Sequence, residues 1–143
     1  MKNILISAIT ILTFGISHAQ TSPEALPLTT TSLASTMKAM SNGLKAVSAQ
    51  SANTQMNENS AILVDQFILS ALHAKDFIAD SIASLPADQQ QAAKAQYDKL
   101  LDDSAELGRQ LAAAFRANNN SLATLILNQL VQNKKEGHSQ FKN

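Results

Sequence analysis

Apolar side chains recur at spacings of three and four residues in four separate stretches of this chain. The clearest stretch contains Leu33, Met37, Met40, Leu44 and Val47. On an α-helix this spacing gathers the side chains on one face, so the pattern predicts an amphipathic helix. Abundant alanine, leucine and glutamine, with few glycines, prolines and β-branched runs, also favour helices over sheet.

Polar breaks divide the chain into four predicted helices. The first begins after a cap at Ser32 or a neighbouring threonine and runs to about residue 50. The second runs from about 59 to 85, where Pro86 stops it, and the third from about 88 to 117. Asparagines and a serine at 118–121 then precede a fourth helix from 122 to about 141. Inward-facing positions of helices two and three include Leu63, Phe67, Ala74, Ile78 and Ile82, then Tyr97, Leu101, Ser104, Leu111 and Phe115.

Four amphipathic helices joined by short connections bury their apolar faces best as an antiparallel bundle. We therefore predict an all-α fold, an up-down-up-down four-helix bundle over residues 32–143. In that order the first and fourth helices are neighbours, and the start of one lies beside the end of the other.

The N-terminal residues predict export. Residues 1–19 begin with Lys2, continue as a short apolar run and end in Ser17-His18-Ala19, the pattern of a cleaved secretory signal peptide. Residues 20–31 contain two prolines among serines and threonines and predict a flexible lead-in. The expected mature protein is soluble in a bacterial periplasm, with no membrane contact after cleavage.

Charge and cysteine content exclude several classes of function. Lysine plus arginine equals aspartate plus glutamate, at 11 each, so no strong field points to nucleic acid. Cysteine is absent, which excludes disulfides, thiolate metal sites and covalent c-type haem attachment. The chain also lacks a P-loop, a nucleophile elbow and a zinc-binding histidine pair, and we do not expect an enzyme.

Two possible iron ligands fall at one end of the expected bundle. His138 continues a line of Leu127, Val131 and Lys134 on the fourth helix, away from the solvated side, and Met37 lies early in the first. A thioether and an imidazole on opposite sides form an axial pair for haem iron, typical of electron-transfer cytochromes. Taken singly, Met37 also suits an ordinary core position, and His138 suits a helix C-terminus. Met40 is a rival ligand, whereas His73 falls off the apolar line of the second helix and is expected at the surface.

The pattern Leu33-x3-Met37-x2-Met40-x3-Leu44-Lys45-x-Val47, followed by His138-x2-Phe141-Lys142, resembles the two ends of the periplasmic cytochrome b-562 family. The resemblance covers the mature chain in helix order and is motif-specific in the first and fourth helices. It implies one non-covalent haem b per chain, with Met37 and His138 as axial ligands. The family has arginines where Lys134 and Lys142 stand, from which an amine can still pair with a haem propionate, and a tyrosine where this chain has Gly137. The expected haem contacts are Leu33, Met40, Leu44, Val131, Lys134 and Lys142.

The expected function is electron transfer by a monomeric periplasmic haem protein that exchanges electrons with an unidentified redox partner protein. The alternative is a haem-free paralogue with the same bundle, acting as a protein-binding or stress-related module of the periplasm. Gly137 and the two lysines at the family's arginine positions motivate that alternative.

Overall fold

The computed structural model describes residues 31–141, and every regular element within them is helical. The elements are α1 (Leu33–Gln50), the 3-10 turn η1 (Thr54–Met56), α2 (Asn57–Ala74), α3 (Asp80–Ala83), α4 (Ala87–Arg116) and α5 (Asn120–Phe141). The predicted all-α fold is confirmed over this range. The signal peptide predicted at 1–19, nearly all of the lead-in predicted at 20–31, and Lys142 lie outside the described residues.

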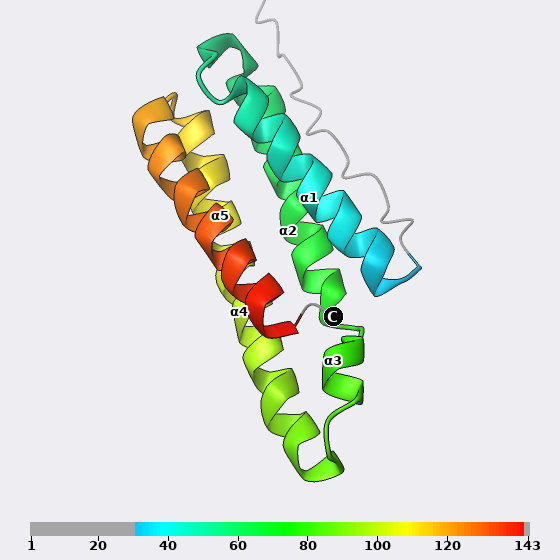
Figure 1. Ribbon diagram of the computed structural model, residues 1–143. Helices are drawn as coiled ribbons and strands as arrows, with labels where there is room; N and C mark the ends of the chain where they lie inside the picture. The colour runs from blue at the N-terminus through cyan, green and yellow to red at the C-terminus, as the bar shows by residue number, and fades with distance from the viewer. Residues whose placement is uncertain (1–30, 142–143) are drawn as a thin grey trace, which may run out of the picture.

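The four long helices lie lengthwise beside one another as two antiparallel pairs, α1 with α2 and α4 with α5 (Figure 1). The closest packing is of α2 against α1 and α4, and of α4 against α5. The α1 and α5 backbones approach each other less closely, and side chains from both line a cavity. Within residues 31–141, none of the helices combines the length and apolar character needed to cross a bilayer.

The start of α1 follows from its sequence. Ser32 has an extended backbone, and its hydroxyl accepts a hydrogen bond from the Ser35 backbone N–H at 3.2 Å. The Ser32 backbone N–H in turn donates to the Ser35 hydroxyl, so two donors that the helix leaves unpaired are satisfied. The predicted cap at Ser32 is confirmed.

The second helix is shorter than the sequence predicts, and the prediction of one helix over 59–85 is wrong. It ends at Ala74, and a separate turn, α3, follows. Carbonyls freed by this break find donors on α4, because the Tyr97 hydroxyl lies 3.4 Å from the Ala74 oxygen and Lys94 Nζ lies 2.9 Å from the Lys75 oxygen. The break also changes which side chains are buried: Ile78 is 59% exposed although the helical pattern placed it inward.

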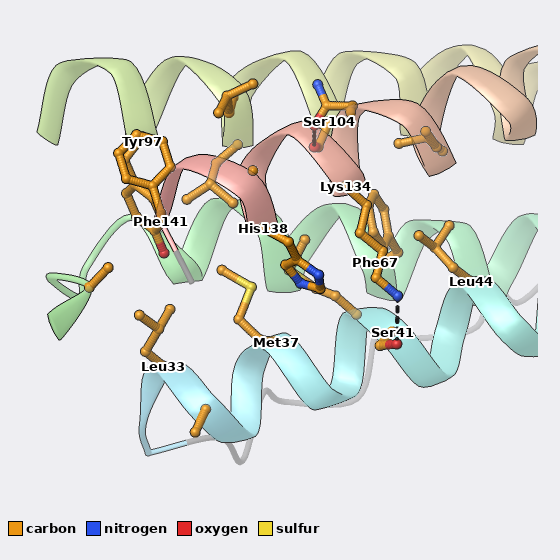
Figure 2. A pocket seen from close by; sticks show the side chains of 18 of the residues that line it. Leu33, Met37, Ser41, Leu44, Phe67, Tyr97, Ser104, Lys134, His138 and Phe141 are labelled. Carbon is orange, nitrogen blue, oxygen red and sulfur yellow. Dashed lines mark hydrogen bonds between the residues drawn. The ribbon is translucent and has the colours of Figure 1, made fainter. Parts of the chain in front are cut away.

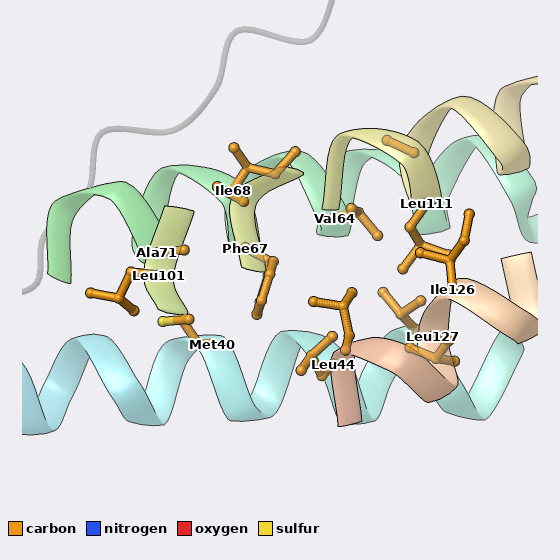
Figure 3. Close-up of a cluster of buried hydrophobic side chains, with 14 of the residues drawn as sticks. Met40, Leu44, Val64, Phe67, Ile68, Ala71, Leu101, Leu111, Ile126 and Leu127 are labelled. Atoms are coloured by element: carbon orange, nitrogen blue, oxygen red, sulfur yellow. The ribbon is translucent and has the colours of Figure 1, made fainter. Parts of the chain in front are cut away.

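Side chains from all four long helices meet in one core (Figure 3). Leu111 and Phe115 on α4 and Val64 on α2 are fully buried, and Leu130 on α5 is almost as completely enclosed. Small residues on α2 and α4 let these two helices approach closely. A Cβ atom added at Gly108 would lie 2.7 Å from Cγ1 of Ile68, closer than real contacts allow.

We expect Gly108→Ala to lower the free energy of unfolding by about 1 kcal/mol. Overpacking typically costs about 1–3 kcal/mol, which outweighs the gain of about 1 kcal/mol in helix propensity. Urea denaturation of both proteins measures the difference. In an Ile68→Ala background the clash is absent, so the same glycine replacement should become neutral or stabilising. Equal losses in both backgrounds would contradict the close approach.

Asparagines join the two connections at the end of the molecule away from α3. The buried Asn57 amide donates to the side-chain oxygens of Asn118 and Asn120, each at 2.9 Å. Asn120 donates in turn to the Ser51 carbonyl at 2.7 Å. Asn118 has a positive φ of 54°, which asparagine tolerates better than most residues, and this reverses the chain after α4. The α1–α2 and α4–α5 connections are thereby tied together by side-chain amides.

Candidate functional site

A cavity of about 430 Å³ lies between α1 and α5, with α4 and α2 behind it and α3 at one end. Cavities of this size are typical of small-molecule and cofactor sites. Its walls are largely apolar and include Leu33, Met37, Met40 and Leu44 on α1, Phe67 on α2, Tyr97, Leu100 and Leu101 on α4, and Leu130 and Phe141 on α5.

Met37 and His138 line this cavity from opposite helices. Figure 2 shows the Met37 thioether extending from α1 and the His138 imidazole extending from α5 into the space between the two helices. The antiparallel order of the helices therefore brings the two predicted ligands to one cavity. His138 is exposed and Met37 is half-buried, so the prediction that His138 lies away from solvent is wrong. The cavity is open on the side where these two side chains stand.

Most of the other predicted contacts line the same cavity: Leu33, Met40, Leu44 and Lys134. Val131 does not. It is half-buried, while the adjacent Leu130 is 1% exposed and contributes to the wall. The inward face of α5 is therefore rotated toward the Ile126–Leu130 line. Met40 is buried and stands beside Met37 in the lining, so it keeps its place as a rival ligand.

His73 lies on α2 and is not among the residues that line the cavity. Its Nδ1 atom is 3.0 Å from an Asp76 carboxylate oxygen, and its ring packs edge-on against Phe77 with centroids 5.1 Å apart. These contacts belong to the break after α2. They give His73 a local role beside that break, where its side chain is half-buried and not fully at the surface as predicted.

Two polar pairs cross the cavity walls, and two of their four members, Ser41 and Asn133, were not predicted from the sequence. Lys134 Nζ on α5 donates to the Ser41 hydroxyl on α1 at 2.9 Å (Figure 2). The Ser104 hydroxyl on α4 donates to the Asn133 side-chain oxygen on α5 at 2.8 Å. Ser41 follows Met40 and Asn133 precedes Lys134, two residues that the sequence does predict as haem contacts. Serine and asparagine in amphipathic helices normally face solvent, so neither was expected at the cavity. Only the helix rotation seen in the structure identifies them.

The α3 end of the cavity is closed by aromatic rings. Tyr97 and Phe141 meet edge-to-face with centroids 5.5 Å apart and an interplanar angle of 80°. The Ser81 hydroxyl donates to the Phe141 carbonyl at 2.8 Å and holds the end of α5 against the turn after α2. The unexpected α3 turn thus forms part of the site.

Burial raises the pKa of the Tyr97 phenol to about 12, with a smaller contribution from the negative charge of Asp98. Between pH 10 and pH 12 an unfolded chain loses this proton while the folded chain keeps it, so stability falls as the pH rises. We expect a loss of about 2 kcal/mol across that window. Urea denaturation at both pH values measures it. Tyr97→Phe should remove this part of the alkaline loss, and an unchanged loss in that variant would contradict the assignment.

Within residues 31–141, no three side chains among His, Cys, Asp and Glu are grouped so that they could hold a metal ion. No family model, curated protein or solved structure matches the chain.

Proposed function

We propose that this protein is a periplasmic electron-transfer protein that binds one non-covalent haem b between α1 and α5, with Met37 and His138 as the axial ligands. The observation that carries the proposal is the entry of a thioether and an imidazole into one apolar cavity from opposite helices (Figure 2). This donor pair suits a low-spin haem iron.

The residues around the cavity fit such a group by their chemistry. Leu33, Met40 and Leu44 would exclude water from one face, and Lys134 would offer its ammonium to a propionate. Because the cavity is open between α1 and α5, a macrocycle larger than the enclosed space can enter with one edge left in solvent. Bound haem would supply a one-electron carrier. With two side chains as axial ligands, the iron would have no open coordination position for a substrate. This favours electron transfer over catalysis.

The proposal includes the finer architecture. The antiparallel α1–α2 and α4–α5 pairs support an up-down-up-down four-helix bundle in which α1 and α5 are neighbours. Cleavage after Ala19 would release a monomer into the periplasm, where an unidentified redox protein would exchange electrons with it. The N-terminal pattern of residues 1–19 supports this location.

An absorption titration tests the proposal. The chain from Gln20 to Asn143 is titrated with haemin and then reduced, and we expect a low-spin spectrum with a thioether-to-iron charge-transfer band in the oxidised form. Met37→Ala should abolish that band. Met40→Ala, which removes the adjacent thioether in the same lining, is the matched control and should keep it.

The histidine ligand is tested in the same way. His138→Ala should abolish the low-spin spectrum, whereas His73→Ala, on α2 and outside the cavity, should leave it intact. A flat titration, or a high-spin spectrum with water as ligand, would contradict the proposal. Loss of the charge-transfer band in Met40→Ala alone would transfer the ligand role to Met40.

A second candidate function is that of a haem-free protein-binding module. Leu122 and Leu125 on α5 are 43% and 62% exposed, and they adjoin alanines of α4 in a shallow apolar surface. If haemin fails to bind, Leu125→Glu should disrupt a complex with a protein that docks on this apolar surface. The substitution should leave the fold intact. Haemin binding with the expected ligands would favour the first function.

A further inference from the structure

Within residues 31–141, Lys134 has no carboxylate partner, unlike the other two half-buried lysines. Among residues 31–141 three lysines are half-buried: Lys75, Lys94 and Lys134. Lys75 pairs with an aspartate at 2.7 Å and Lys94 with another at 2.6 Å. Within the same range no carboxylate lies within ion-pair distance of Lys134, whose ammonium donates to the neutral Ser41 hydroxyl. A partly desolvated ammonium gains most from an anionic partner.

The Lys134 ammonium lies at one end of the cavity, which is where an anionic group of a ligand would bind. Lys134 lies where α5 faces Ser41 of α1, at the wall of the cavity (Figure 2). Among the described residues that line the cavity, the one acidic residue is Asp80 on α3, and α3 contacts the Phe141 end of α5. Lys134 and Phe141 are seven residues apart on α5, or about 10 Å along the helix axis. The cavity therefore has a cationic end at Lys134 and an acidic residue at the other end.

The space between these ends suits an alkyl chain. It is bordered by Met37, Met40 and Leu44 on α1 and by leucines on the facing helices. A cavity of about 430 Å³ falls in the size range of small-molecule sites. Its apolar walls suit the alkyl chain of a single-chain fatty acid, and dodecanoate serves as the probe of this ligand class.

We propose that the haem-free protein binds a single-chain fatty acid in this cavity, with the carboxylate on Lys134 and the alkyl chain directed toward Phe141. The ammonium replaces its hydrogen bond to Ser41, or shares it, with a charge-assisted bond to the carboxylate. The proposal does not depend on haem binding, because it uses neither axial donor as a ligand.

Methionine methyl groups report on this site directly. The chain from Gln20 to Asn143, prepared without haem and with ¹³C-labelled methionine methyls, is titrated with dodecanoate below its micelle concentration. The Met37 and Met40 signals should shift together and saturate, since both residues line the cavity. Met56, in η1 and outside the lining, is an internal control and should not move. Equal shifts of all three signals, or no shift, would overturn the proposal.

The charge is tested with neighbouring lysines. Lys134→Gln keeps a donor near Ser41 but removes the charge, and we expect about tenfold weaker dodecanoate binding in calorimetry. Lys135→Gln removes the charge of the neighbouring, exposed lysine. This variant should bind dodecanoate as tightly as the unmodified protein does. Decanol, which is uncharged, should bind both variants equally. If Lys134→Gln and Lys135→Gln weaken dodecanoate binding equally, the role of Lys134 is overturned. A thermal melt verifies that both variants fold.

Discussion

Phe115→Ala is expected to lower the free energy of unfolding by about 3–5 kcal/mol. The Phe115 side chain is fully buried on α4, among the largest side chains enclosed in the core. Its truncation removes apolar surface from the interior and leaves a cavity that helices packed on several sides cannot collapse to fill. Urea denaturation followed by circular dichroism measures the loss from the shift in midpoint at unchanged slope.

Leu125→Ala is the matched control for this prediction. Leu125 is 62% exposed on α5, and its truncation should change stability by less than about 0.5 kcal/mol. A loss below about 1 kcal/mol for Phe115→Ala would show that the α4 face is not enclosed as described. A similar loss for Leu125→Ala would indicate that this leucine is covered in solution.

Haemin is expected to stabilise the fold strongly. At a free concentration one hundred times its dissociation constant, a ligand that binds only the folded state adds about 2.7 kcal/mol to the free energy of unfolding. Acidification should reverse this gain, because protons would compete with iron for the proposed ligand His138. Thermal melts with and without haemin, at neutral and acidic pH, measure both effects. His138→Ala should remove most of the stabilisation at neutral pH.

Iron-free protoporphyrin IX provides the control. It offers the same apolar surface and propionates but cannot accept axial ligands, so its effect on the melting temperature should be smaller and independent of Met37. Equal stabilisation by the two compounds would mean that the cavity binds the macrocycle without ligation. A bound haemin fraction that persists unchanged into strong acid would count against His138 as a ligand.

The sequence was sufficient to predict the helices whose signals are local. The Ser32 cap and the spacing from Leu33 to Val47 predict α1, and the boundaries of α4 were predicted to within one residue. The end of α2 could not be predicted, because residues 75–85 contain neither glycine nor proline. That break is stabilised by Lys94 and Tyr97, side chains about twenty residues away that donate to the freed carbonyls. Periodicity carries no information about such contacts.

The candidate site was predictable to the extent that it follows from helix order. An antiparallel arrangement places Met37 and His138 at the same end, and the structure has both in one cavity lining. The rotation of α5 was not predictable, since the lines through Leu130 and Val131 are both apolar over their first turns. That rotation decides that Leu130 forms the wall and that Asn133 faces Ser104.

The asparagine cluster ties the two interhelical connections together at one end of the molecule. Asn57, Asn118 and Asn120 fasten the two helical hairpins to each other at one end, while the cavity and its two facing donors lie toward the other. Across the cavity, a hydrogen bond between Lys134 and Ser41 joins α5 to α1. At the cavity end α2 and α4 stay joined, because Lys94 and Tyr97 on α4 donate to the carbonyls at the end of α2. Widening the gap between α1 and α5 would therefore change one side of the molecule while the α2–α4 side stays packed.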